Sequence, residues 1–410
     1  MNESMQRAAA RRTRLLERFP EGLVLVRGTG PAGLNPNFFY LTGLTEPAGI
    51  LALSAAGLRT STGKDHPGPD YLSGRLVRQA LFLPQHDPVA ARWGEDARAT
   101  HEGTHEDAVG VDAVLSTSET SARLSEWLRG ATRLGYVRAA AAFVDGPDSD
   151  AVFIDSIRNR FLNVEMRDVT PVIAEFRTVK DEFEIAAIER AAGVTATGFG
   201  RVLGALRPGI KEHQLDAELA AVYRDAGAGN AFEPIVGAGR NALKLHYRDN
   251  DGPIEPGDLV LVDSGAKLGG YCADVTRTYP ADGAFTPRQR EVYTAVLAAQ
   301  VAAIEAIRPG VLLGELHAIA WQSIDASGFG AAFIHGIGHH LGIETHDAGN
   351  IHEPLRAGAV ITVEPGIYLA DEGLGIRIED DVLVTADGFR ELTAGIPKTI
   401  ETIEASMARR

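Results

Sequence analysis

An internal repeat of roughly 100 residues constrains this chain more than any other feature. The segment GDLVLVDSG (Gly257–Gly265) matches GAVITVEPG (Gly358–Gly366) at an offset of 101 positions. With an offset of 105, DVTRTYPADG (Asp274–Gly283) matches EDDVLVTADG (Glu379–Gly388), so four extra residues fit into the connection between the second pair of strands. Solenoid repeats are shorter than this. The repeat therefore predicts one domain built from two similar halves.

The repeat aligns carboxylates at the ends of apolar strands. The run Leu259–Val262 is typical of a buried strand, and the Gly-rich turn after it predicts a hairpin. Asp263 then aligns with Glu364, and Asp274 aligns with Glu379. One such aspartate alone could be an ordinary turn residue or a solvated edge residue, but a second aligned pair argues against that interpretation. Four buried carboxylates are costly unless cations neutralise them, so we expect them to converge around two divalent cations.

Four histidines lie close together near the second set of carboxylates: His335, His339, His340 and His346. A spacing of four residues is also found in zinc-binding helices, but Gly336 and two further glycines disfavour a helix here. Glycine clusters also mark ordinary polar surface loops. The apolar residues between the histidines favour a loop or irregular strand whose side chains point into a site.

The length of 410 residues is too great for a single ordinary domain. Residues 1–174 alternate apolar runs, among them Phe38–Leu41, with helical stretches, which predicts an α/β or α+β domain. It offers no cluster of candidate ligands, and His101 and His105 are interpreted as part of a polar surface loop. Residues 175–410 form the second domain. Its expected helices are Phe183–Leu206, Glu212–Ala226, Pro287–Ile307 and Leu313–Ser327.

Charge and cysteine usage exclude several classes of protein. The chain carries 40 Lys and Arg against 55 Asp and Glu, a net charge of −15, which argues against binding to nucleic acid or to an anionic membrane. Its single cysteine, Cys272, excludes an intramolecular disulfide and favours a reducing compartment. No apolar run approaches the length needed to span a membrane, and the N-terminal segment lacks the pattern of a secretory signal. We therefore expect a cytoplasmic protein.

The order of candidate ligands resembles the five-ligand dinuclear site of the pita-bread metallopeptidases: Asp263, Asp274, His339, Glu364 and Glu379. Within that superfamily the chain resembles the proline-specific branch, and most closely the aminopeptidase P family. The motifs that carry this resemblance are KLHYRDN (244–250), HGIGHHLGIETHD (335–347), TVEPGIY (362–368) and GIRIEDD (375–381). The resemblance implies an α+β fold of two domains, with an N-terminal creatinase-like α/β domain (1–174) and a C-terminal pita-bread domain (175–410) with an internal pseudo-two-fold repeat.

The resemblance also implies how metal is held. Asp263 would bind one ion through both oxygens, Asp274 and Glu379 would bridge two ions, and His339 and Glu364 would complete the other site. Carboxylate oxygens with one imidazole favour Mn²⁺, with Co²⁺, Fe²⁺ and Zn²⁺ as alternatives. Two close divalent cations lower the pKa of a bridging water and stabilise the tetrahedral oxyanion. Glu364 would accept the proton of that water.

Four further residues are expected around the substrate. By resemblance, His246 and His346 would bind the scissile amide and its developing charge, and His335 and Arg377 would frame the site beyond the cleavage point. For His246 and His346, buried structural histidines are the alternative. Arg377 can orient the ligand Glu379 or make a plain cross-strand ion pair, and both interpretations are open. His340, Asp380 and Asp381 are assigned supporting roles.

The implied activity is release of the first residue from peptides with proline in second position, by a homo-oligomer (dimer or tetramer). An Xaa-Pro dipeptidase with the same dinuclear site is the alternative. A metal-free binding protein or an amidinohydrolase on this fold is disfavoured, because all five ligands are present. Two departures from the family pattern, Asn37 and the segment around Trp93, bear on peptide length and on subunit contacts.

Overall fold

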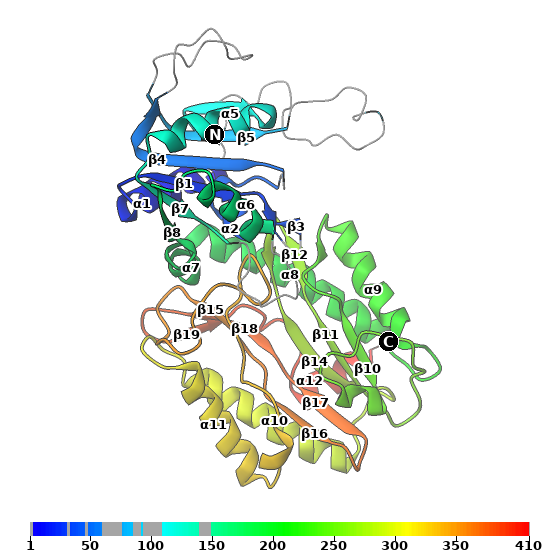
Figure 1. Cartoon of the computed structure of the whole chain (residues 1–410). Helices are drawn as coiled ribbons and strands as arrows, with labels where there is room; N and C mark the ends of the chain where they lie inside the picture. Colours follow the sequence, from blue (N-terminus) through cyan, green and yellow to red (C-terminus); the bar gives the residue numbers. More distant parts are fainter. Residues whose placement is uncertain are drawn as a thin grey trace. The chain divides into compact units, whose positions relative to one another are not determined.

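The computed structural model describes residues 3–30, 33–45, 48–59, 76–84, 92, 109–138 and 149–409. It separates into two units, Met1–Ala174 and Glu175–Arg410 (Figure 1). Among the described residues, each unit has a hydrophobic core of its own. The histidines His101 and His105 and the segment around Trp93 lie outside the described residues.

The N-terminal unit is built on a six-stranded mixed sheet in the order β6-β5-β4-β1-β7-β8. The strand β1 pairs antiparallel with β4 and parallel with β7. The strands are β1 (Leu23–Arg27), β4 (Ile50–Arg59), β5 (Leu76–Leu83), β6 (Ala113–Ser116), β7 (Arg133–Tyr136) and β8 (Glu165–Asp168), with a short pair β2 (Thr29–Gly30) and β3 (Gly33–Leu34). The helices are α1 (Glu3–Arg18), α2 (Pro36–Thr42), η3 (Thr117–Glu119), α5 (Thr120–Arg129) and α6 (Ser149–Arg158), and α7 (Thr170–Thr178) crosses the boundary between the units.

The apolar run Phe38–Leu41 belongs to helix α2 and not to a strand. The side chain of Asn35 caps this helix by accepting from the backbone N–H of Asn37, and Pro36 occupies its first turn. Gly43 ends it in the left-handed region at φ 70°. The side chain of Asn37 is buried here and donates to the carbonyl of Arg138 at 3.2 Å.

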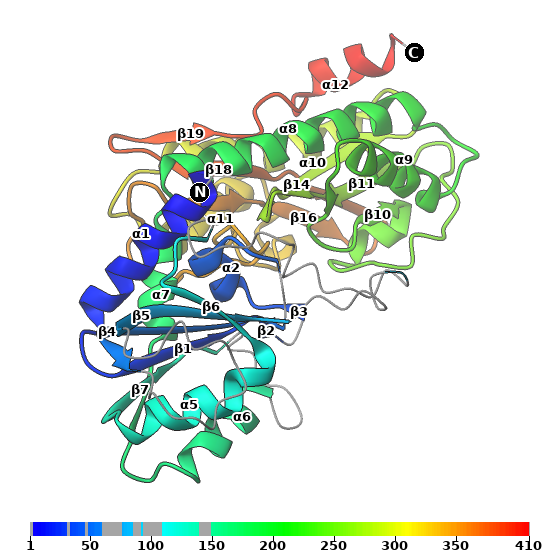
Figure 2. The same ribbon diagram turned by 90° about the horizontal axis from the view of Figure 1, so that it is seen from above.

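The C-terminal unit contains the two halves that the repeat predicts. Helices α8 (Glu182–Ala205) and α9 (Glu212–Asp225) of the first half match α10 (Pro287–Glu305) and α11 (Leu313–Ala326) of the second. Likewise β11 (Leu259–Ser264) and β14 (Val275–Pro280) match β15 (Val360–Val363) and β18 (Asp380–Val384). Figure 2 shows α8, α9 and α10 along one side of the strands β11, β14 and β16 (Gly366–Leu369).

The two halves meet through hydrogen bonds between β14 and residues at the end of β17 (Leu374–Arg377) and just after it. The N–H of Glu379 donates to the carbonyl of Thr276 at 3.0 Å, and the N–H of Arg377 donates to Thr278 Oγ1 at 3.2 Å.

The remaining elements of the C-terminal unit are β9 (Gly229–Asn230), β10 (Ile235–Ala238), η4 (Gly239–Leu243), β12 (Ala266–Leu268), β13 (Tyr271–Cys272), η5 (Gly330–Ala332), β19 (Phe389–Glu391) and α12 (Ile400–Met407). Within the part of the chain that the structure describes, no helix has the length and apolar character needed to cross a membrane.

Candidate active site

The ends of the repeated strands bring four carboxylates together where the halves meet. Asp263 lies in β11 opposite Thr276 of β14, and Asp274 directly precedes β14. In the second half, Glu364 directly follows β15 and Glu379 directly precedes β18. Because β11 and β15 are buried along their whole length, the acids at their ends are carried into the interior of the unit.

Two glycines permit the close approach of the segments around these acids. A Cβ on Gly265 would lie 1.7 Å from the carbonyl oxygen of Ala273, and a Cβ on Gly338 would lie 2.0 Å from that of Thr362. Any other residue would push these backbones apart, since real Cβ contacts do not come this close. Glycine at position 265 therefore sets the distance between Asp263 and the segment that leads to Asp274.

The histidine segment is irregular, as its glycines predicted, and the structure places it alongside β15. The N–H of Thr362 donates to the carbonyl of His339 at 2.9 Å, and the N–H of Glu364 donates to the carbonyl of Ile337 at 2.8 Å. This pairing directs the imidazole of His339 at the acids. Its Nε2 lies 3.5 Å from Asp274 Oδ2 and 3.7 Å from Glu364 Oε1.

The resulting cluster has the character of a site for divalent cations. Ligand atoms of Asp274, His339 and Glu379 lie within 4.8 Å of one another. Burial and the neighbouring carboxylates raise the pKa of Asp274 and Glu379 well above the usual range, and burial raises the pKa of Glu364 to about 7. The buried Oδ1 of Asp263 has no hydrogen-bond partner among the described residues. A divalent cation would relieve both the repulsion and the unsatisfied oxygen, so these residues fit such an ion.

These pKa shifts predict that the metal-free protein loses stability as the pH rises from 6.5 to about 8. The pKa of Glu364 is raised to about 7 in the folded state, so across this window the folded protein releases a proton that the unfolded chain has already released, and the free energy of unfolding falls with rising pH. The raised pKa of Asp274 and of Glu379 acts in the same direction. Burial lowers the pKa of His335 and His340 to about 4, but this opposite effect acts only below the ordinary histidine pKa of 6.5. Denaturant unfolding of chelator-treated protein across this window measures the slope. A rise in stability would contradict the buried carboxylate cluster, and a saturating divalent metal should remove the fall.

Arg377 links the two halves through Asp263. Its Nη2 donates to Asp263 Oδ2 at 2.6 Å, its Nε donates to Thr276 Oγ1 at 3.1 Å, and its Nη1 donates to the Tyr368 hydroxyl at 3.0 Å. Thr276 in turn donates to Glu379 Oε2 at 2.6 Å. Thr276 therefore bridges Arg377 and Glu379 by hydrogen bonds. The ion pair that it makes joins β17 to β11 of the other half and is not a pair between adjacent strands.

His335 lies at the edge of the carboxylate cluster. Its Nε2 is 3.0 Å from the Tyr368 hydroxyl, and its Nδ1 is 4.0 Å from Glu364 Oε2. Burial, followed by the charge of Arg377, lowers the pKa of His335 to about 4. The imidazole is therefore neutral at neutral pH.

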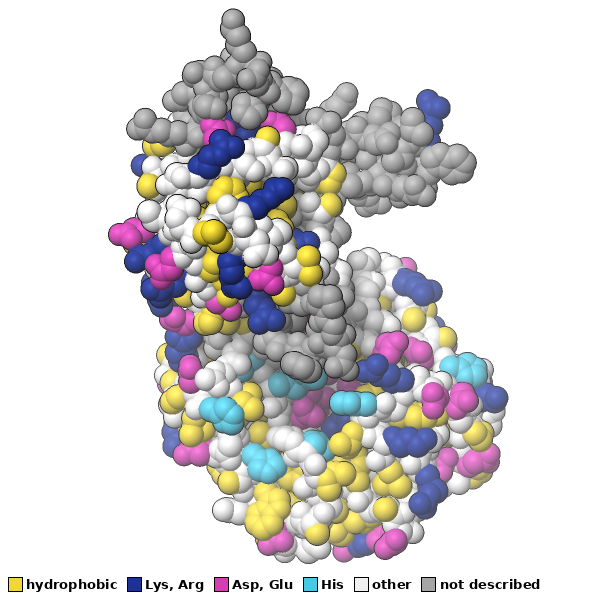
Figure 3. All heavy atoms as spheres, in the orientation of Figure 1, with side chains coloured by type: hydrophobic (Ala, Val, Ile, Leu, Met, Phe, Trp, Pro, Cys, Tyr) yellow, Lys and Arg dark blue, Asp and Glu magenta, His cyan; other side chains and the backbone are white. Residues whose placement is uncertain are grey.

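His246 and His346 are both exposed and lie on loops of different halves. The ring of His346 packs edge-on against the candidate ligand His339, with 4.2 Å between ring centroids. Although its side chain reaches the surface, partial desolvation of the ring lowers the pKa of His346, and the imidazoles of His339 and His246 lower it further. His246 is thus close enough to His346 to act on it electrostatically. Figure 3 shows histidine side chains gathered around acidic atoms in a hollow on this face of the C-terminal unit.

Sequence reasoning missed two polar residues of the site. Thr276 lies two residues after Asp274, and side chains two apart in a strand lie on the same face. The alternation of the strand could therefore have predicted that Thr276 lies beside Asp274. Tyr368 connects His335 with Arg377, and its role depends on the pairing of β16 with β17, which no local pattern discloses.

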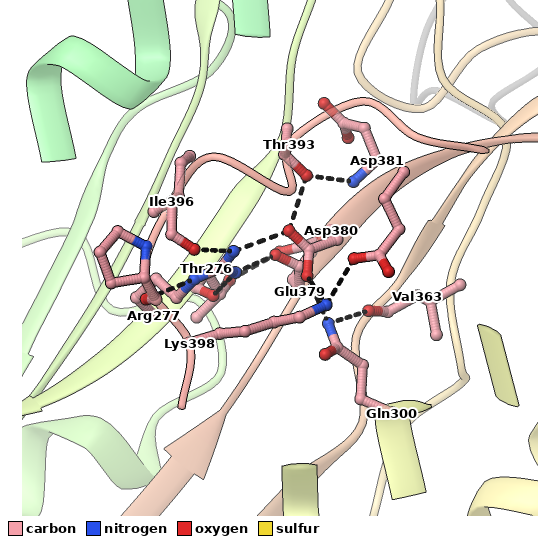
Figure 4. Close-up of polar contacts among 12 residues, drawn as sticks. Thr276, Arg277, Gln300, Val363, Glu379, Asp380, Asp381, Thr393, Ile396 and Lys398 are labelled. Carbon is pink, nitrogen blue, oxygen red and sulfur yellow. Dashed lines mark hydrogen bonds and ion pairs between the residues drawn. The ribbon is translucent and has the colours of Figure 1, made fainter. Parts of the chain in front are cut away.

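Behind the carboxylate cluster, Asp380 is held in a buried network (Figure 4). Its carboxylate accepts from Arg277 Nη2 at 2.7 Å and from Lys398 Nζ at 2.8 Å. Although burial opposes it, the charges of Arg277 and Lys398 lower the pKa of Asp380 to about 2. Arg277 also donates to the carbonyl of Glu379 at 2.5 Å, so the network fixes the backbone of that acid. Asp381 supports the cluster as well, since its Oδ2 accepts from the N–H of Asp274 at 3.1 Å.

Comparison with family models matches both units. The model of the aminopeptidase P N-terminal domain matches residues 8–135, and that of metallopeptidase family M24 matches residues 186–386. The chain is 32% identical to the Xaa-Pro aminopeptidase of Escherichia coli (strain K12), covering 92% of this chain and 89% of that protein. It is 31% identical to Xaa-Pro aminopeptidase 1 of Streptomyces coelicolor, covering 98% and 86%.

Solved structures give the same result. The aminopeptidase PepP of Pseudomonas aeruginosa matches with a TM-score of 0.85 at 31% identity, covering 99% of this chain and 98% of that one. Aminopeptidase P from Escherichia coli with the inhibitor Pro-Leu matches with a TM-score of 0.84 at 29% identity, covering 100% and 99%. These matches confirm the expected α+β fold, with an N-terminal aminopeptidase P domain and a C-terminal pita-bread domain. The chain belongs to the M24 metallopeptidase family, in its aminopeptidase P branch, and is a hydrolase.

Proposed function

We propose that this chain is a metal-dependent aminopeptidase that releases the N-terminal residue of peptides with proline in second position. The observation that carries the proposal is the approach of Asp274, His339 and Glu379, whose ligand atoms lie within 4.8 Å of one another, in a chain of this family. The relatives' names support the substrate class, because they are Xaa-Pro aminopeptidases. They do not favour the dipeptidase alternative.

Five residues would hold two divalent cations: Asp263, Asp274, His339, Glu364 and Glu379. When bound, the ions supply an activated water and polarise the scissile carbonyl. Mn²⁺ is the ion we propose, because the donor set is mostly carboxylate oxygen, and Co²⁺, Fe²⁺ and Zn²⁺ are the alternatives.

The side chains of the chain then move protons and bind the substrate. Glu364 accepts the proton of the attacking water and delivers it to the proline nitrogen as the Xaa-Pro bond breaks. His246 and His346 each donate one hydrogen bond to the scissile amide and its developing charge. His335 and Arg377 bind the part of the peptide beyond the cleavage point. Because proline has no N–H, this site cannot depend on that donor for recognition.

The first test is hydrolysis of an Xaa-Pro-Yaa tripeptide. We expect release of the first residue, complete loss of this activity after exhaustive chelation, and recovery on adding Mn²⁺. An Xaa-Ala-Yaa tripeptide serves as the control for proline specificity, and an Xaa-Pro dipeptide separates the aminopeptidase from the dipeptidase. Full activity in a preparation verified to contain no metal would exclude the dinuclear mechanism.

Two further predictions concern the state of the protein in the cell. A homo-oligomer, dimer or tetramer, is proposed from the family resemblance. A cytoplasmic location is proposed from the single cysteine, Cys272, which is buried and free.

A further inference from the structure

His246 lies on a loop that the repeat duplicates. The loop comprises residues 239–258 between β10 and β11, and we call it the first histidine loop. At the offset of 101 it corresponds to residues 340–359, the second histidine loop, which carries His346. The side chain of His246 is exposed, so packing of that side chain cannot hold it in place. Another part of the loop must fix its position.

A buried carboxylate, that of Glu212, lies at the base of the first histidine loop. Glu212 is the first residue of α9 and has 0% exposure. Its Oε1 accepts from the N–H of Ala238 at 2.7 Å and from Asn241 Nδ2 at 3.0 Å. Its Oε2 accepts from the hydroxyl of Tyr247 at 2.8 Å and from the N–H of Gly252 at 2.7 Å. One carboxylate thus contacts the start, the middle and the far side of the loop.

None of these four donors is a cation. The charge of Glu212 is stabilised instead by four hydrogen bonds and by its place at the N-terminus of α9, where the helix dipole favours a negative group. The loop is built closely around it. A Cβ on Gly252 would lie 2.9 Å from Glu212 Oε2, so the glycine is needed for this approach.

The repeat shows that this carboxylate is not required by the fold of each half. At the offset of 101, Glu212 corresponds to Leu313, the first residue of α11. The second histidine loop is fixed differently, through the buried carboxylate of Asp347, which binds Arg177 Nη2 at 2.5 Å and Lys180 Nζ at 3.2 Å. The same helix start therefore forms without an acid at this position. Glu212 serves the first histidine loop specifically.

The opposite side of the loop rests on the strand that carries Arg377. A Cβ on Gly375 in β17 would lie 2.4 Å from the carbonyl oxygen of Ala242 in η4. The loop is thus clamped between Glu212 and β17. On the Glu212 side, the hydroxyl of Tyr247 holds the residue directly after His246.

We propose that Glu212 is a positioning residue that holds the imidazole of His246 at the scissile amide by fixing the first histidine loop through Ala238, Asn241, Tyr247 and Gly252. The inference rests on the proposed function, in which His246 donates a hydrogen bond to the substrate.

The test is the variant Glu212→Gln in the full, metal-loaded protein. An amide keeps the size of the side chain but has one acceptor oxygen, so its NH₂ group must face one of the two backbone N–H groups, of Ala238 or Gly252. We expect kcat on an Xaa-Pro-Yaa tripeptide to fall about 10²-fold, as a displacement of about 1 Å can do, with the metal content unchanged. The double variant Glu212→Gln/His246→Ala should be no slower than the slower single variant, because both changes remove the same contact.

Two further variants keep the inference testable. Glu315→Gln alters the acid in the first turn of the repeat-related helix α11, which caps the N–H of Leu312 at 2.8 Å and touches no part of the first histidine loop. It should keep kcat within a few-fold. If Glu212→Gln does not fold, Tyr247→Phe removes a single hydroxyl and should still lower kcat several-fold, without adding to His246→Ala.

Three outcomes would overturn the positioning role in an active wild type. They are an unchanged kcat in Glu212→Gln, a kcat loss that multiplies with that of His246→Ala, and a loss of metal that accounts for the lost activity. Failure of the proposed function has a different signature, since the wild-type protein would then not cleave the Xaa-Pro-Yaa tripeptide at all.

Discussion

Asp274→Asn should lose bound metal and activity together, while its metal-free form is at least as stable as that of the wild type. The amide of asparagine offers one neutral oxygen in place of two carboxylate oxygens, so it cannot bridge two cations and metal occupancy should fall. Because a bound metal supplies several kcal/mol of transition-state stabilisation, we expect activity to fall about 10³-fold or more. The same change removes one of the mutually repelling buried carboxylates, whose burial already raises the pKa of Asp274.

Three measurements on one protein check this prediction. Metal analysis should show reduced occupancy, steady-state kinetics should show the loss of activity, and melting with and without added Mn²⁺ should show a smaller metal-dependent gain in Tm than in the wild type. The control is His335→Ala, since His335 contacts the hydroxyl of Tyr368 at 3.0 Å and is not a ligand in this assignment. Equal metal loss in both variants would show that the histidines are wrongly assigned. A metal-free Asp274→Asn protein much less stable than the metal-free wild type would contradict the repulsion argument.

The sequence predicted the C-terminal unit well because a pattern found in one half can be checked at the equivalent positions of the other half. The same offset of 101 that aligns the strands also aligns the ends of α9 and α11 residue by residue. A buried acid at one strand end has several explanations, but two acids at equivalent ends have few. That is why Asp263, Asp274, Glu364 and Glu379 could be expected at one place before the packing of the halves was known.

What the sequence could not supply depends on contacts across long stretches of chain. Arg377 contacts Asp263 from 114 residues away, and this pairing follows from how β17 lies against β11. In the same way, nothing near Glu212 in the sequence indicates that it contacts Gly252, because the two meet only after the first histidine loop closes. The short apolar run in α2 was ambiguous for a different reason. Four apolar residues fit a strand or a helix, and the capping residue Asn35 and Pro36 decide for the helix.

The histidines His246 and His346 should act on the transition state without holding metal. Replacing either by alanine removes one donor to the developing charge, and loss of such a donor typically lowers kcat by roughly 10²–10³. We expect that fall for each variant, with two metal ions still bound and with KM changed much less. Both side chains are exposed, so truncation should change Tm little, in contrast to the loss expected of buried structural histidines.

The variants His246→Ala and His346→Ala differ in whether the lost imidazole also contacts a proposed metal ligand, and this difference helps to separate their roles. His346 packs against the ring of His339 with 4.2 Å between centroids, so His346→Ala can loosen this proposed ligand, whereas the first histidine loop, which carries His246, contains none of the five proposed ligands. Glutamine at either position keeps an N–H donor and should recover part of the lost kcat. If His246→Ala lowers Tm but leaves kcat within a few-fold, that histidine is structural. If His346→Ala loses activity only in proportion to lost metal, its role is to support His339, and the contact with the substrate belongs to His246 alone.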